Sequence, residues 1–195
     1  MYMRSLGYIS GVFLLIFAVS ASAQELQRYG FGSTASPQEL TKYFAIQPDG
    51  RTLPPGSGTA ESGAHLFAER CAACHGEHLE GIPRKGVGGD KLIGGRGTLN
   101  TATPVKTVES YWPYATTLFD YVKRAMPFNA PGSLTDDEVY SLVAYILSQA
   151  KIIEPNQIMN ASSLPKVEMP NRAGFERDPR PETQLYSSNA CCGSK

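Results

Sequence analysis

The feature that most constrains this chain is the stretch Cys71-Ala72-Ala73-Cys74-His75, in which a histidine directly follows the second of two closely spaced cysteines. A thioredoxin-like redox pair requires a surrounding βαβ pattern, and none is visible here. A zinc site built from Cys71, Cys74 and His78 lacks an obvious fourth ligand. The third interpretation is covalent attachment of a haem to both thiols, with His75 as an iron ligand. The rest of the sequence favours this one.

A haem that carries electrons needs a second axial ligand, and a methionine thioether commonly supplies it. Beyond the N-terminal segment the chain has three methionines, Met126, Met159 and Met169. Met126 lies between two predicted helices, and Pro127 restricts the backbone at that point. We therefore expect His75 and Met126 to be the axial ligands of one covalently bound haem c.

The pattern of apolar residues predicts a mostly α fold. Residues 59–71 are expected to form a helix that delivers Cys71, and residues 116–124 a second helix. The strongest helix signal covers residues 136–149, where Thr135 and Glu138 match a capping box. Its apolar stripe repeats at helical spacing and consists of Val139, Leu142, Val143, Ile146 and Leu147.

Two other segments have weaker signals. Residues 76–107 are rich in glycine without strand-like alternation, so we expect irregular backbone that passes close to something flat and bulky. A short helix over residues 36–44 is expected because Ser36, Pro37 and Glu39 form a helix-start pattern.

The N-terminus is typical of an export signal. Arg4 precedes an apolar stretch over residues 7–18, and Ala21-Ser22-Ala23 offers a small-residue cleavage site. We expect cleavage after Ala23, a periplasmic mature protein and no stable membrane span; an uncleaved anchor is the alternative. The 18 basic and 18 acidic residues form no run of like charge, which argues against a nucleic-acid partner.

At these residues the chain resembles the class I cytochromes c. In that family a glycine and an aromatic residue precede the first haem cysteine by eight and four positions, where Gly63 and Phe67 stand here. The last helix of the family carries a Leu-x-x-Tyr-like pair that crosses this glycine, and Leu142 and Tyr145 match it. The resemblance implies the class I cytochrome c helical fold around one covalently bound haem.

The resemblance also implies roles for residues around the haem. Pro83 is expected to present its carbonyl to the ring N–H of His75. Trp112 is expected to pack in the haem crevice, or alternatively to bond a haem propionate through its indole N–H. Arg96 and Lys106 are further candidates for a propionate, although solvated charges are the more usual case.

A narrower resemblance runs from about Tyr29 to Phe175. The stretches "GGRGTL", "TPVKTVESYWPYATTLFDYVKRAMPF" and "LPKVEMPNRAGF" are similar to the cytochrome subunits of periplasmic molybdenum enzymes that oxidise sulfur compounds, namely sulfite dehydrogenases and sulfane dehydrogenase. The sulfane dehydrogenase cytochrome is commonly a two-haem chain. The single Cys-x-x-Cys-His here therefore favours a stand-alone, single-haem subunit.

This resemblance implies a non-catalytic electron-transfer protein. Its donor would be a molybdenum-containing sulfite or sulfane dehydrogenase, and its acceptor another cytochrome or an oxidase. One alternative is a general soluble carrier to a terminal oxidase without a fixed partner. Another is a haem protein that binds or senses a small ligand. A zinc-stabilised binding module is the interpretation without haem.

The expected organisation is a signal peptide over residues 1–23, a haem domain over residues 59–151, and irregular extensions over residues 24–58 and 152–195. Composition alone indicates disordered extensions. The resemblance reaches into both of them, so we favour straps that wrap the haem domain and a partner. Cys191 and Cys192 would form a strained ring if bonded to each other; a bond to a partner chain and free thiols are both open.

Overall fold

The computed structural model describes residues 32–34, 36, 46–83, 88–176 and 179–180. The chain divides into two compact units, residues 1–36 and 37–195, and the fold described here belongs to the second. The predicted signal peptide, residues 37–44 of the expected short helix, and Cys191 and Cys192 lie outside the described residues. In the part of the chain that the structure describes, no helix has the length and apolar character needed to cross a bilayer.

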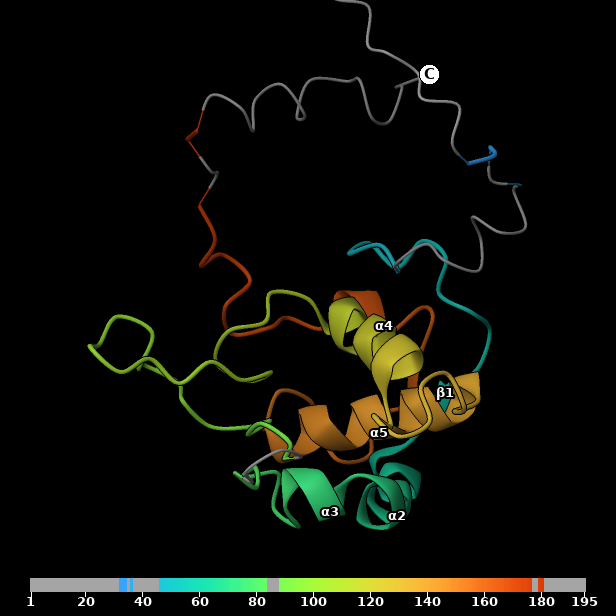
Figure 1. Ribbon diagram of the computed structural model, residues 1–195, viewed down its shortest axis with the longest axis horizontal. Coiled ribbons are helices and arrows are strands. Elements are labelled where there is room, and N and C mark those ends of the chain that lie inside the picture. Colours follow the sequence, from blue (N-terminus) through green and yellow to red (C-terminus); the bar gives the residue numbers. More distant parts are fainter. Residues whose placement is uncertain (1–31, 35, 37–45, 84–87, 177–178, 181–195) are drawn as a thin grey trace, which may run out of the picture. The chain divides into compact units, whose positions relative to one another are not determined.

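The fold is mostly helical, as predicted, with very little strand (Figure 1). Two two-residue strands, one before and one after the α-helices in the sequence, form one antiparallel pair, in which Ser57 is opposite Asn160. The elements in chain order are β1 (Ser57–Gly58), α2 (Ala60–Arg70), α3 (Ala72–His75), α4 (Ala115–Ala125), α5 (Asp136–Gln149), β2 (Met159–Asn160) and the 3₁₀ helix η1 (Leu164–Lys166).

Side-chain caps define where two of the helices begin. Thr59 caps α2 by accepting a hydrogen bond from the backbone N–H of Ser62 at 3.2 Å. At the start of α5 the predicted capping box is present: Thr135 Oγ1 accepts from the N–H of Glu138, and Glu138 Oε2 accepts from the N–H of Thr135 at 2.7 Å. These bonds satisfy backbone donors that the first turn of a helix cannot pair internally.

Helices α2 and α5 lie side by side (Figure 1). They approach closely at Gly63. A Cβ atom at Gly63 would lie 1.9 Å from the carbonyl oxygen of Ser141, so only glycine allows this approach. One turn later the rings of Phe67 and Tyr145 meet with their centroids 5.3 Å apart. The helix crossing that the resemblance implied is therefore confirmed.

The core lies around α5. Its predicted apolar stripe is buried throughout, and α4 contributes Leu118, Phe119 and Val122 to the same core. The rings of Phe119 and Tyr140 are 4.5 Å apart. Each such side chain contributes about 1.5–3 kcal/mol when fully buried, so this packing holds α4 and α5 together.

The described parts of both extensions pack on the helices. In the N-terminal strap (residues 46–58), the N–H of Ile46 donates to Asp120 Oδ1 at 2.9 Å, and the carbonyl of Pro54 accepts from the hydroxyl of Tyr140 at 2.9 Å. In the C-terminal strap (residues 152–176), the buried side chains are Ile153, Met159, Leu164, Val167 and Met169. The β1–β2 pair that joins the two straps was not predictable from sequence, because its strands are too short and too far apart to show a pattern.

Candidate functional site

A cavity of about 860 Å³ opens between the Cys-x-x-Cys-His turn, the end of α4 and one face of α5. Cofactor pockets in proteins span roughly 300–1,000 Å³, so the cavity has room for a bulky group. Cys71, Cys74, His75, Trp112 and Met126 all line it. Most of the remaining lining is apolar and includes Phe67, Leu92, Val108, Leu118, Val122, Leu134, Leu142 and Ile146.

The two cysteines occupy a tight helical turn. Cys71 ends α2 and precedes α3, with its N–H bonded to the carbonyl of Phe67 at 2.9 Å. The carbonyl of Cys71 accepts from the N–H groups of Cys74 and His75 at 3.0 and 2.9 Å. Both cysteines are free thiols. Burial raises the pKa of the Cys71 thiol to about 11, whereas a catalytic redox cysteine has a lowered pKa. Burial at this turn thus works against a reactive thiolate at Cys71.

The imidazole of His75 is fixed by a backbone carbonyl. Its Nδ1 lies 2.8 Å from the oxygen of Asp90. Because a carbonyl oxygen only accepts hydrogen bonds, Nδ1 must carry the proton, which leaves the lone pair of Nε2 for a metal. This contact also makes the ring a better electron donor to a metal.

In this structure the carbonyl that meets the ring N–H of His75 belongs to Asp90 and not to Pro83, the residue that the resemblance implied. Pro83 is exposed and does not line the cavity, and Asp90 is the partner of the ring. The reason lies at Gly89, whose N–H bonds the carbonyl of Cys74 at 3.0 Å and brings residues 89–90 against the imidazole. A Cβ at Gly89 would lie 2.7 Å from Nδ1 of His75. The glycine-rich composition signalled a close backbone approach, but not which glycine makes it.

Met126 reaches the cavity from the end of α4. It caps that helix with extended backbone, and its N–H still bonds the carbonyl of Val122 at 3.1 Å. The other two candidates, Met159 and Met169, are 0% and 3% exposed in the core and do not line the cavity. The geometry therefore supports Met126 over both of them.

Trp112 lines the cavity and packs edge-on against Tyr121, with ring centroids 5.8 Å apart. Lys106 also lines the cavity, and its Nζ lies 5.1 Å from the ring centroid of Tyr111. Both residues are thus placed to meet a bound group. Arg96, the other basic candidate for a propionate, does not line the cavity.

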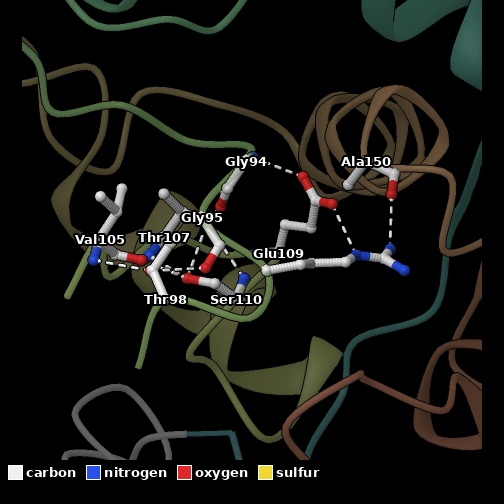
Figure 2. A network of polar contacts seen from close by, with 9 residues as sticks. Gly94, Gly95, Thr98, Val105, Thr107, Glu109, Ser110 and Ala150 are labelled. Atoms are coloured by element: carbon white, nitrogen blue, oxygen red, sulfur yellow. Dashed lines mark hydrogen bonds and ion pairs between the residues drawn. The ribbon is translucent and has the colours of Figure 1, made fainter. Parts of the chain in front are cut away.

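Arg96 instead belongs to a polar network that sequence reasoning missed. Figure 2 shows this network, with Glu109, Gly94 and Ala150 among its labelled members. Its Nε pairs with Glu109 Oε1 at 2.6 Å, and its terminal nitrogen donates to the carbonyl of Ala150 at 2.8 Å. Glu109 also accepts from the N–H of Gly94 at 2.5 Å. A cation is favourable at the C-terminal end of α5, where Ala150 lies. The network therefore attaches the loop of residues 94–110 to α5.

The same network holds the part of this loop that lines the cavity. Thr107 Oγ1 donates to the carbonyl of Gly94 at 2.7 Å, and Ser110 Oγ donates to the carbonyl of Val105 at 2.6 Å (Figure 2). Thr107, which lines the cavity, is 3% exposed. These contacts fix an otherwise irregular segment without any regular secondary structure.

The donor set fits a haem and not a small ion. Among the described residues there is no group of three His, Cys, Asp or Glu side chains that could hold a metal ion, and His78 is exposed. The zinc interpretation thus gains no support. A large, mostly apolar cavity with two free thiols, an imidazole and a thioether on its lining suits a flat apolar group that is held by thioether bonds and two axial ligands.

Comparisons with known proteins agree with this geometry. The family model described as "Cytochrome c" matches residues 60–150. The chain is 38% identical to a chain in the crystal structure of the sulfane dehydrogenase SoxCD from Paracoccus pantotrophus, with a TM-score of 0.68, covering 86% of this chain and 82% of that one.

Two curated relatives are named thiosulfate dehydrogenase. The one from Psychrobacter arcticus is 28% identical over 129 residues, covering 58% of this chain and 34% of the relative. The one from Stutzerimonas stutzeri is 27% identical over 107 residues, covering 54% of this chain and 32% of the relative. The chain thus spans about one third of the length of these relatives.

Proposed function

Because this chain belongs to the cytochrome c family, we propose that it is a periplasmic single-haem electron carrier that receives electrons from a sulfur-compound dehydrogenase. Its likeness to a chain of the sulfane dehydrogenase structure extends over most of both chains, and its curated relatives are named for thiosulfate oxidation. Both findings support a sulfur-oxidation context.

The residues that would hold the haem are the ones that meet at the cavity. Cys71 and Cys74 would form thioether bonds, and His75 Nε2 and Met126 Sδ would be the axial ligands. When bound, haem supplies an iron that takes up and releases one electron at a time. The single Cys-x-x-Cys-His in the sequence supports one haem for each chain.

The chain's own side chains prepare this site in three ways. The carbonyl of Asp90 fixes the tautomer of His75 and strengthens it as a ligand. The apolar lining excludes water, which lowers the reorganisation that accompanies a change of charge. Lys106 and the indole N–H of Trp112 offer donors to a propionate group at the same cavity.

The proposed partner is a molybdenum-containing sulfite or sulfane dehydrogenase, with another cytochrome or an oxidase as acceptor. Within such a pair this chain would perform no bond chemistry. The periplasmic location rests on the export-signal pattern of residues 1–23 and on the covalent attachment that the Cys-x-x-Cys-His motif implies.

The observation that carries the proposal is the meeting of Cys71, Cys74, His75 and Met126 at one apolar cavity. To test the function, the tagged full chain is purified from its native periplasm and mixed with sulfite or thiosulfate while haem absorbance is followed. We expect rapid reduction and a molybdenum protein that co-purifies. A haem that stays oxidised with both compounds, in a protein without a stable partner, would instead favour a general carrier.

A further inference from the structure

The Met126 loop (residues 126–133) has little internal structure to hold the methionine in place. The N–H of Met126 still bonds the carbonyl of Val122 in α4. The hydrogen bonds within the loop are local turns, from the N–H of Ala130 to the carbonyl of Pro127 at 2.9 Å and from the N–H of Ser133 to the carbonyl of Ala130 at 3.3 Å. Phe128, at its tip, is 75% exposed. The position of Met126 therefore depends on how the two ends of the loop are fixed.

Lys123 joins those two ends. It lies in the last turn of α4, three residues before Met126. Its Nζ donates to the backbone carbonyl of Leu134 at 2.7 Å and pairs with Asp136 Oδ1 at 2.8 Å, both at the start of α5. One ammonium group therefore connects the last turn of α4, just before the loop, to Leu134 and Asp136, just after it.

The environment makes this bridge stronger than an ordinary surface ion pair. The side chains of Lys123 and Asp136 are 33% and 35% exposed, so water screens them only in part. A cation in the last turn of α4 and an anion in the first turn of α5 also suit the dipoles of the two helices. The contact to the Leu134 carbonyl is a charge-assisted hydrogen bond.

The bridge acts directly on the cavity. Leu134, whose carbonyl is held, is 2% exposed and lines the same cavity as Met126. We propose that Lys123 is a positioning residue that holds the Met126 thioether at its ligand position by bridging the ends of the Met126 loop. This inference rests on the proposed role of Met126 as an axial ligand.

The strength with which Lys123 holds Met126 in place can be measured by competition with an added ligand. Imidazole added to the oxidised protein competes with Met126 for the iron, so its apparent affinity reports how firmly the thioether is held. Loosening the loop destabilises the state with Met126 in place and raises that affinity. A charge-assisted hydrogen bond of ordinary strength corresponds to about a tenfold change.

The test uses the holoprotein and titrates imidazole by absorbance. Lys123→Met keeps the length of the side chain and removes the charge, and we expect an association constant about tenfold higher. Lys123→Arg, which keeps the charge, should give an association constant close to the native value.

Lys166→Met, at an exposed lysine of η1, is the matched control and should change the association constant for imidazole by less than about twofold. If Lys123→Met impairs folding, Asp136→Asn keeps the contact to Leu134 and should raise the constant about threefold.

Repeating the titration in the Met126→Ala protein separates this inference from the assignment of Met126 as an iron ligand. Met126→Ala should itself raise imidazole affinity and change the oxidised spectrum, and adding Lys123→Met to it should have almost no further effect. An unchanged constant in Lys123→Met, or an equal rise in both backgrounds, would overturn the positioning role. If Met126→Ala leaves the spectrum and the affinity unchanged, the ligand role of Met126 is wrong and the inference falls with it.

Discussion

At the scale of single residues, the site depends on a backbone segment that runs past an imidazole. The carbonyl of Asp90 sets the tautomer of His75, and Gly89 allows that segment to come close enough. Neither residue belongs to the Cys-x-x-Cys-His motif. The proposed ligand His75 is thus oriented by residues about fifteen positions away, which a motif alone does not reveal.

Gly89→Ala tests this arrangement. The added methyl group would lie 2.7 Å from Nδ1 of His75 and must displace the ring or the segment, which weakens the hydrogen bond to Asp90. His75 then donates less charge to the iron, so we expect the reduction potential to rise, on the order of 50 mV. Protein-film voltammetry of the holoprotein measures this.

Gly97→Ala is the control for a glycine change in the same region. Its φ is +76° and nothing lies within 4 Å of an added Cβ, so it should lower stability through backbone strain and leave the potential unchanged. Equal potentials in Gly89→Ala and the native protein would show that the contact does not tune His75.

The residues that meet at the cavity were predictable where a local sequence pattern marks them. Cys71, Cys74 and His75 form a contiguous pattern, and Met126 could be chosen because it lies between two helices that the sequence predicts. The partner of His75 could not be predicted, since it depends on the path of a glycine-rich loop. The resemblance pointed to Pro83, but the fold brings Asp90 to the ring.

At the scale of elements, the contact between α2 and α5 requires a glycine. Gly63→Ala would place a methyl group 1.9 Å from the carbonyl oxygen of Ser141 and would push the helices apart. Because this backbone cannot move without disturbing the core, we expect a loss of about 3 kcal/mol in the free energy of unfolding. Urea denaturation of the holoprotein measures the loss.

The control for Gly63→Ala is Ala68→Gly, a change at an exposed position of the same helix. It should cost about 1 kcal/mol through helix propensity alone. A Gly63→Ala variant as stable as the native protein would mean that the helices do not approach as closely as the structure shows.

The capping box of α5 predicts a pH dependence. Hydrogen bonds from the backbone N–H and the hydroxyl of Thr135 hold the pKa of the Glu138 carboxyl below its usual value of 4.5. Since the folded-state pKa is lowered, the carboxylate's contribution is fully present above about pH 4.5 and is lost as pH falls through the folded value. Glu138→Ala should cost about 1 kcal/mol at pH 7, and the difference should shrink in acid. Chemical denaturation at pH 7 and pH 3 would show this; an equal difference at both would contradict it.

Elements could be predicted where short-range patterns define them. The limits of α5 and its capping residues follow from a contiguous stretch, and so does the stripe that packs in the core. Long-range contacts were not predictable. The Arg96–Glu109–Ala150 network joins three segments, and no local pattern shows that Arg96 would lie at the end of α5.

At the scale of the whole molecule, the two straps are part of the haem domain's own packing. Deleting residues 152–195 would remove Met159 and Leu164, both fully buried in the core. Each contributes about 1.5–3 kcal/mol, so we expect this truncation to prevent stable folding.

The composition of the C-terminal strap did not indicate that this segment is ordered. Proline-rich, aperiodic sequence over residues 152–176 suggests disorder, yet spaced apolar residues in it fill the core beside α4 and α5. Only a resemblance that reached into these segments pointed to ordered straps. A truncated chain of residues 152–195 removed that folded and kept its haem would show that the straps serve another purpose.

Covalent haem attachment is tested most directly by the intact mass of the purified, exported protein, together with its absorption spectrum in alkaline pyridine. We predict one haem bound covalently to each chain, located by peptide mapping at Cys71 and Cys74. A protein with both thiols unmodified, or one that carries zinc in place of haem, would contradict covalent haem attachment at Cys71 and Cys74.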